Sequence, residues 1–349
     1  MSSTEQSTAD AYYATLPPHH VHPLWKAAGL MRRAPEQRAV AHVWRYADVA
    51  PLLHEAGEVV TAAEAERRVL MLTNPGLDGE AAATANLYAG LQLVKPGEVA
   101  PKHRHVAAAI RLVVEGGGAT TTVDGERTTM RTGDLVLTPN WAWHDHANAG
   151  DEPIVWLDGL DIPLVNKLDV PFFESPGEAP QVPARPDDAS ARAWAGGRLN
   201  PAWTTWEHPY APVLNYPFAQ TERILRETAR DTEGSPYDGV LFNYTNPIDG
   251  GPPLPTIGCA AQLLAAGRRT LAHRHTSSAV YHVLAGHGRS VVDGTVLEWG
   301  PRDTFAVPGW AAHHHEAAGD QDALLFSFTD APVLAALGLL REEATACAS

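Results

Sequence analysis

Three histidines spaced as on β-strands are the residues of this chain best suited to chemistry. His103 and His105 stand two positions apart in GEVAPKHRH, and His144 follows in GDLVLTPNWAWHDHAN. Residues i and i+2 of a strand point to the same face, so the first two side chains project together and the third can reach them from a neighbouring strand. Three neutral imidazoles favour a first-row transition metal and leave further coordination positions open.

An arginine close to this triplet predicts an anion site. Arg111 lies six residues beyond His105 and therefore keeps the strand parity of the metal ligands, and its planar fork matches a carboxylate. Asp158, in the apolar stretch WLDGLD, is expected to orient Arg111 or one of the histidines. The chemistry favoured by this set is metal-assisted conversion of a small acid.

The elements that position these residues are predicted to be short strands. From Leu87 onward, alternating apolar runs are separated by glycine turns, and Asp124-Gly125 is typical of a hairpin. A capping-box pattern predicts a short helix from Thr61, and a second helix is expected over 218–231. The predicted division is a helical and extended region (1–85), a first barrel (86–165), a connector with a helix (166–235), a second barrel (236–335) and a tail (336–349).

The second group of strands repeats the first. His103-Arg104-His105 recurs as His273-Arg274-His275, and Asp124-Gly125 recurs as Asp293-Gly294. The remaining matches pair Gln92 with Gln262, Gly116 with Gly286, Pro139 with Pro308, Trp141 with Trp310 and His144 with His313. A period of about 170 residues fits a duplicated domain rather than a solenoid. The sequence therefore predicts an all-β protein of two related barrels.

Bulk composition excludes several other classes of protein. The 349 residues are 44% hydrophobic and 19% charged, as expected of a globular protein of two domains. A formal net charge of −15 argues against nucleic acid, and no apolar run suits a membrane span. With only Cys259 and Cys347, a disulfide framework is excluded and a cytoplasmic location is expected.

The histidine motifs resemble the two signature motifs of the cupin superfamily. The residues in register are Gly97, His103, His105, Gly116, Gly133, Pro139, His144 and Asn148. Cupins usually place a glutamate ligand where this chain has Ala109, so an all-histidine site is implied. Together with EAERRVL, YAGLQLVKPGEVAPKHRH, WLDGLDIPLV and YTNPIDGGPPLPTI, this pattern resembles the gentisate 1,2-dioxygenases and their relatives acting on salicylate or 1-hydroxy-2-naphthoate. The resemblance implies a bicupin of two jelly-roll barrels.

The same resemblance implies an activity and its site residues. Ferrous iron on His103, His105 and His144 would bind a hydroxylated aromatic acid and O2, and gentisate would yield maleylpyruvate in aromatic catabolism. Catalytic roles fall to His146, as an acid–base group, and to Arg111 and Asp158; the expected substrate contacts are Arg111, Arg67, Gln92, Tyr88 and His146. Members of this family commonly form homotetramers.

The second barrel is expected to be degenerate. It keeps His273, His275 and His313, but Tyr281 replaces the arginine and Ser327 replaces Asp158. The resemblance places the working iron in the first barrel, and whether the second triad binds a metal stays open.

Other functions compete with this hypothesis. Salicylate and 1-hydroxy-2-naphthoate dioxygenases share the pocket, and the choice between substrates depends on wall residues such as Tyr88 and Gly90. A tyrosine hydroxyl at position 88 suits the additional hydroxyl of gentisate. A non-catalytic ligand-binding cupin would tend to lose ligands, whereas the first site is complete. A metal-dependent isomerase would retain the glutamate that is missing at Ala109.

Overall fold

The computed structural model describes residues 3–65, 67–177, 179–194 and 199–345, so Cys347 lies outside the described residues. The chain divides into two compact units, residues 1–36 and 37–349. The first contains α1 (Ser3–Thr15) and the short turns η1 (Pro17–His19) and η2 (Leu24–Lys26). Within it, Trp25 Nε1 donates to the Tyr13 hydroxyl at 3.1 Å. Across the described ranges, no helix has the length and apolarity needed to cross a membrane.

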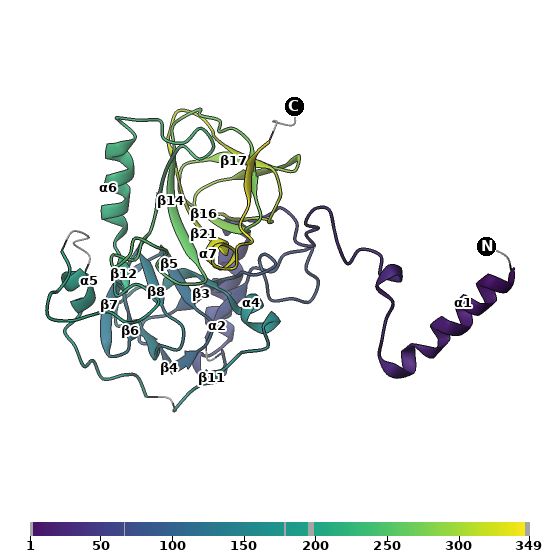
Figure 1. The fold of residues 1–349 in the computed structure, drawn as a ribbon. Helices are drawn as coiled ribbons and strands as arrows, with labels where there is room; N and C mark the ends of the chain where they lie inside the picture. Colours follow the sequence, from purple (N-terminus) through teal and green to yellow (C-terminus); the bar gives the residue numbers. More distant parts are fainter. Residues whose placement is uncertain (1–2, 66, 178, 195–198, 346–349) are drawn as a thin grey trace. The chain divides into compact units, whose positions relative to one another are not determined.

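The second unit is built from two barrels, each made of a six-stranded and a five-stranded sheet (Figure 1). The six-stranded sheet of barrel 1 contains β12 (Asn215–Tyr216), β8 (Leu135–Thr138), β5 (Ala109–Glu115), β10 (Ile154–Leu160), β3 (Tyr88–Val94) and β2 (Val69–Met71). Its five-stranded sheet contains β11 (Phe173–Glu174), β4 (Val99–His105), β9 (His144–Ala147), β6 (Gly117–Val123) and β7 (Glu126–Arg131).

Barrel 2 repeats this plan with strands from the second half of the chain and β1 from near its start. Its six-stranded sheet contains β1 (His42–Trp44), β19 (Thr304–Val307), β16 (Ala279–Ala285), β21 (Ala323–Thr329), β14 (Gly258–Leu264) and β13 (Val240–Asn243). Its five-stranded sheet contains β18 (Thr295–Trp299), β17 (Gly288–Val292), β20 (His313–Ala317), β15 (His273–His275) and β22 (Glu342–Ala344). The helices of this unit are α2 (Tyr46–Val59), α3 (Ala62–Ala65), α4 (Ile162–Lys167), α5 (Ala189–Trp194), α6 (Phe218–Thr228) and α7 (Ala331–Ala336).

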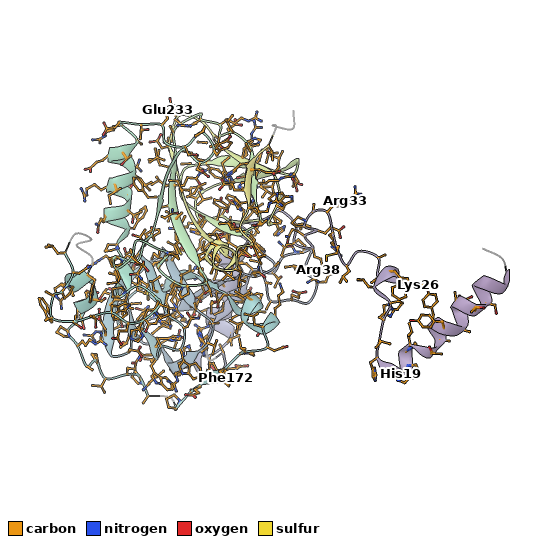
Figure 2. The ribbon with its side chains drawn as sticks, viewed as in Figure 1. His19, Lys26, Arg33, Arg38, Phe172 and Glu233 are labelled. Atoms are coloured by element: carbon orange, nitrogen blue, oxygen red, sulfur yellow. The ribbon has the colours of Figure 1, made fainter. Side chains whose placement is uncertain are left out.

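The two six-stranded sheets pack against each other through their outer faces. Every residue of β3 and β10 is buried, because one face lines barrel 1 and the other faces barrel 2. Leu91 and Leu157 share a buried cluster with Phe326 and Phe328 of barrel 2. The two sheets approach closely at Gly159, since a Cβ there would lie 2.8 Å from the Phe328 ring. Side chains pack throughout both barrels, while Phe172 and Glu233 lie at the outer surface (Figure 2).

Segments outside the two strand blocks contribute edge strands. In the 1–85 region, β1 pairs with β19 of barrel 2, whereas β2 pairs with β3 of barrel 1. The connector supplies β11 and β12 to barrel 1, and the tail supplies β22 to barrel 2. The helix expected over 218–231 begins at Phe218 and ends at Thr228. The all-β, two-barrel fold expected from the sequence is confirmed.

The duplication extends to the backbone of the turns. Asp124 and Asp293 adopt φ values of 44° and 45° at the expected hairpins. Trp141 and Trp310 adopt φ values of 62° and 65°, which are uncommon for a bulky residue. Their backbone N–H groups donate to the carbonyl oxygens of His105 and His275, at 2.8 and 2.6 Å. Each copy thus ties the turn before its third histidine to the strand that carries the first two.

Candidate metal centre and active site

The predicted histidine triplet is assembled inside barrel 1. His103 and His105 lie on β4, and His144 lies on the antiparallel neighbour β9, where it pairs in register with His103. One ligand nitrogen from each residue lies within 4.8 Å of the other two. Strand alternation and strand pairing are therefore sufficient to bring the three imidazoles together.

Hydrogen bonds prepare these imidazoles to bind a metal. Each Nδ1 lies within hydrogen-bonding distance of a backbone carbonyl, at 2.7 Å for His103, 2.7 Å for His105 and 2.9 Å for His144. When Nδ1 donates its proton, Nε2 keeps a lone pair directed into the barrel. Among the described residues, Nε2 of His103 and of His144 is buried without a hydrogen-bond partner. Burial lowers the pKa of His103 to about 3 and that of His105 to about 4, so both rings are neutral. The donor set fits a first-row divalent metal.

A buried ion pair faces the triad from the opposite sheet. Arg111 on β5 pairs in register with Asp158 on β10, and Arg111 Nε lies 3.2 Å from Asp158 Oδ1. Arg111 also donates to the Thr138 hydroxyl, and Trp156 Nε1 donates to Asp158 Oδ1 at 3.1 Å. Burial raises the pKa of Asp158 to about 6 despite the opposing charge of Arg111, so the carboxylate is ionised at neutral pH. The contact with Asp158 restricts the orientation of the Arg111 guanidinium.

His146 has the features of a proton acceptor. It lies on β9 with its ring 5.8 Å from that of His144. The Thr121 hydroxyl donates to Met130 Sδ at 3.2 Å and lies 2.9 Å from His146 Nδ1, so it can accept the Nδ1 proton. Nε2 then carries the lone pair, and it is buried without a partner. Burial, followed by the charge of Arg111, lowers the pKa of His146 and keeps the ring neutral.

Strand β3 forms one wall of the site. Tyr88, Gly90 and Gln92 share one face of the strand, and Gln92 Nε2 is buried without a hydrogen-bond partner. The Tyr88 hydroxyl lies 2.6 Å from the position that a Cβ of Gly90 would occupy. The absence of a side chain at position 90 therefore allows Tyr88 to lie against its own strand. Burial, followed by the charge of Asp158, raises the pKa of the Tyr88 hydroxyl, which remains a neutral hydrogen-bond donor.

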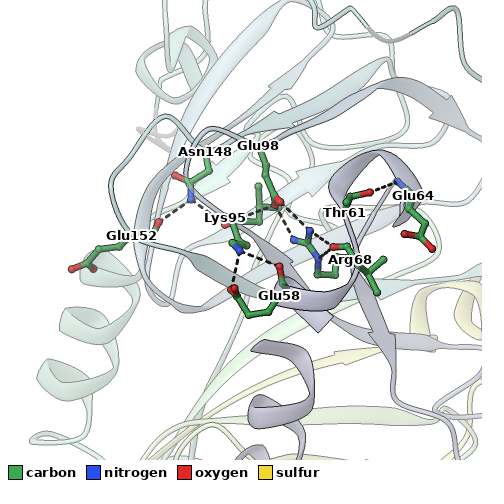
Figure 3. Close-up of polar contacts among 11 residues, drawn as sticks. Glu58, Thr61, Glu64, Arg68, Lys95, Glu98, Asn148 and Glu152 are labelled. Carbon is green, nitrogen blue, oxygen red and sulfur yellow. Dashed lines mark hydrogen bonds and ion pairs between the residues drawn. The ribbon is translucent and has the colours of Figure 1, made fainter. Parts of the chain in front are cut away.

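Arg67 lies close enough to act on the site electrostatically. Its positive charge is the second cause, after burial, of the lowered pKa of His103. Its guanidinium lies 5.4 Å above the Phe173 ring, which in turn stacks on His103 at 5.8 Å. The neighbouring Arg68 fixes this segment with two 2.9 Å bonds to the Glu98 carboxylate (Figure 3).

The start of this segment is capped as the sequence predicted. The Thr61 hydroxyl accepts a hydrogen bond from the Glu64 N–H at 3.2 Å, at the beginning of α3 (Figure 3). Arg68 also donates from Nη2 to the Val60 carbonyl at 2.8 Å. The two contacts fix Val60 and Thr61 at the start of the short helix that precedes Arg67.

Three contacting residues were not predicted from the sequence. Thr138 and Thr121 resemble ordinary strand threonines, although strand parity places Thr121 on the face that could meet His146. Phe173 lies in a proline-rich connector with no strand pattern, yet β11 pairs it with His105 on β4. No local pattern indicates that pairing.

Comparisons with known proteins agree with this geometry. The cupin domain family matches residues 90–160 and 261–329. Gentisate 1,2 dioxygenase 1 of Aquipseudomonas alcaligenes is 43% identical over 332 residues, covering 95% of each chain. A 5-aminosalicylate 1,2-dioxygenase of Comamonas sp is 43% identical, covering 98% of this chain and 91% of the relative. The crystal structure of a salicylate 1,2-dioxygenase from Pseudoaminobacter salicylatoxidans with gentisate matches with a TM-score of 0.90 at 35% identity, covering 97% of this chain and 94% of that one. This chain belongs to the gentisate 1,2-dioxygenase family of bicupin dioxygenases.

Proposed function

We propose that this protein is an Fe(II)-dependent dioxygenase that cleaves gentisate with O2 to give maleylpyruvate. The observation that carries the proposal is the pairing, in one barrel, of three neutral histidines with the buried Arg111–Asp158 pair on the opposite sheet. A neutral ligand set leaves the metal charge uncompensated, so an anionic substrate is favoured. The names of the relatives support the same chemistry.

The residues of barrel 1 have separate tasks in this reaction. When bound, ferrous iron supplies the route by which an electron-rich ring passes electrons to O2. The planar guanidinium of Arg111 binds the substrate carboxylate, and the charge of Arg67 adds to the attraction. Asp158 and Thr138 act as positioning residues, because they hold Arg111 in one orientation.

His146 is assigned the proton transfer. Its Nε2 has no protein partner and carries the lone pair when Thr121 accepts the Nδ1 proton. It is thus able to take the proton of the substrate hydroxyl next to the carboxylate, which increases electron donation from the ring. The ring bond that breaks joins the carboxyl-bearing and hydroxyl-bearing carbons. His146 then holds the proton until the product is released.

Tyr88 favours gentisate over salicylate. Its neutral hydroxyl can bind the second hydroxyl of gentisate, a group that salicylate lacks. The second hydroxyl also makes the ring richer in electrons and easier to oxidise. An amino group at the same ring position would make a similar contact, and one relative is named for 5-aminosalicylate.

The proposal extends to assembly and location. The first unit exposes large apolar side chains, including Leu30, Trp25 and Met31, and burying them between subunits would support the expected homotetramer. Cys259 is buried and forms no disulfide within the described part of the chain, which suits a reducing cytoplasm. Light scattering of the purified chain at two concentrations tests the tetramer directly.

Reconstitution with iron tests the proposed activity. The purified chain is loaded anaerobically with Fe(II), mixed with gentisate and then with O2, while oxygen uptake and product absorbance are followed. One O2 consumed per gentisate is expected. Oxygen uptake with only salicylate or 1-hydroxy-2-naphthoate would keep the reaction and change the substrate. No uptake with any of the three, despite bound iron, would support a non-catalytic ligand-binding protein.

Two arginine variants test how the substrate is bound. Arg111→Met is expected to raise the KM for gentisate at least about tenfold, because a buried charge-assisted contact is lost. Arg127→Met is the control, since Arg127 pairs with Asp187 at the surface. Equal kinetics of the two variants would exclude Arg111 as the carboxylate contact.

A further inference from the structure

Barrel 2 contains a second triad with the geometry of a metal site. His273 and His275 lie on β15, His313 lies on β20, and one nitrogen from each is within 4.8 Å of the other two. Nε2 of His273 and of His313 is buried without a hydrogen-bond partner among the described residues. A buried polar atom left unsatisfied costs about 1–3 kcal/mol, and a metal ion bound between these two nitrogens would satisfy both.

Two of the three outward nitrogens of this triad face backbone carbonyls, as in barrel 1, and the third faces a carboxylate. Nδ1 of His275 lies 2.8 Å from the Ser277 carbonyl, and Nδ1 of His313 lies 3.0 Å from the Ala311 carbonyl. Nδ1 of His273 lies 3.2 Å from the Glu342 carboxylate on β22. A carboxylate behind a metal-binding histidine raises the basicity of the ring and fixes its tautomer.

The interior around the triad cannot bind an aromatic acid as barrel 1 does. Tyr281 and Ser327 pair in register where barrel 1 pairs Arg111 with Asp158. The Tyr281 ring stacks on Phe305 at 4.9 Å, with an angle of 5° between the planes. A stacked aromatic pair thus occupies the place of the cation that would meet a carboxylate.

The charge next to the triad is reversed between the barrels. Arg67 stands just before β2 in barrel 1, and Asp238 stands just before β13, the equivalent edge strand in barrel 2. Asp238 Oδ1 lies 3.7 Å from His273 Nε2. In barrel 1 the anion would come from the substrate, whereas in barrel 2 the protein itself provides a carboxylate.

We propose that barrel 2 binds a second divalent first-row metal ion through Nε2 of His273, His275 and His313, with Asp238 as its anionic partner. Three imidazoles and one carboxylate suit such an ion without an exogenous ligand. The ion holds β22 to the barrel, because metal binding fixes the His273 tautomer that donates to Glu342. The role of this site is structural.

Metal counting tests the site independently of catalysis. The full chain is loaded anaerobically with Fe(II), desalted and analysed for metal per chain. We expect about two ions in the unmodified chain and about one in either His313→Ala or His144→Ala. Gentisate should still perturb the spectrum of His313→Ala but not that of His144→Ala. One ion per chain that is lost in His144→Ala and unaffected by His313→Ala would overturn the proposal.

Cobalt titration keeps the test decisive if His313→Ala fails to fold. In the His144→Ala background, Co(II) should still produce the visible absorption of one protein-bound ion. Asp238→Asn in the same background should weaken that binding about 10–100-fold, whereas the exposed control Asp320→Asn should leave it unchanged. No cobalt band in a folded His144→Ala chain, or equal affinities for the two aspartate variants, would contradict the site as described. Failure of the gentisate assay would leave the metal counts and the cobalt affinities interpretable, because neither depends on gentisate.

Discussion

Replacing Gly159 by alanine is expected to strain the contact between the two barrels. The added Cβ would lie 2.8 Å from two atoms of the Phe328 ring and 2.9 Å from Ile110 Cδ1. Carbon atoms pack best at about 3.5–4.0 Å, so the facing groups must move apart by roughly 1 Å. Overpacking of this kind costs about 1–3 kcal/mol. For a chain of 349 residues, that corresponds to a fall in Tm of roughly 1.5–4 °C.

Thermal unfolding of the metal-loaded protein measures this effect. Gly117→Ala is the matched control, because Gly117 lies exposed on β6 and its added Cβ would meet Met130 O at an ordinary 3.6 Å. The Tm of the control is expected to change by about 1 °C or less. Removing the ring with Phe328→Leu should destabilise the Gly159→Ala protein less than it destabilises the unmodified chain.

Two results would refute the argument on Gly159. One is a Gly159→Ala protein that melts within about 1 °C of the unmodified chain. The other is additive behaviour of Gly159→Ala and Phe328→Leu, which would show that the glycine does not serve the contact with the Phe328 ring.

Three further predictions concern the chemistry of barrel 1. Burial raises the pKa of Asp158 to about 6, so the side chain is ionised above that pH and protonated below it. We therefore expect kcat/KM to fall up to about tenfold for each pH unit below 6. The Asp158→Asn variant should not show this pH dependence. A ferrous chelator should abolish oxygen uptake while far-UV circular dichroism stays unchanged, and Fe(II), but not Zn(II), should restore activity. Recovery of oxygen uptake with Zn(II) would exclude a redox role for the metal ion. Thr121→Val removes the acceptor for His146 Nδ1 and should lower kcat about 10–100-fold with little change in KM, whereas an effect on KM alone would contradict the assigned role.

The metal triad could be predicted because the necessary information is local. His103 and His105 need only strand alternation to share a face, and the turn before His144 is marked by Pro139. The internal repeat added a second line of inference, since Tyr281 at the position of Arg111 showed that the two barrels differ in chemistry. Arg111 then followed from parity along its strand, whereas Asp158 was a candidate from its place in the apolar stretch WLDGLD.

Contacts made by short, distant segments could not be predicted in the same way. His42–Trp44 is too short to show alternation, and its partner strand begins at Thr304. Phe173 reaches β4 through only two paired residues. Pairings of this kind depend on tertiary packing rather than on the propensity of the segment. Asp238 was missed for the same reason, because its position next to His273 arises from the path of the chain before β13.

The placement of β1 has a consequence for how such a protein can evolve. The first strand of the chain, His42–Trp44, belongs to barrel 2. The next strand, Val69–Met71, belongs to barrel 1, and the chain enters barrel 2 again only at Val240. A gene split between the two halves would leave β19 with a bare edge in one product and an unpaired β1 in the other. Each product would also expose the apolar face now buried between the barrels. Once β1 had become an edge strand of barrel 2, the duplicated halves could diverge in chemistry but could no longer separate into independent proteins.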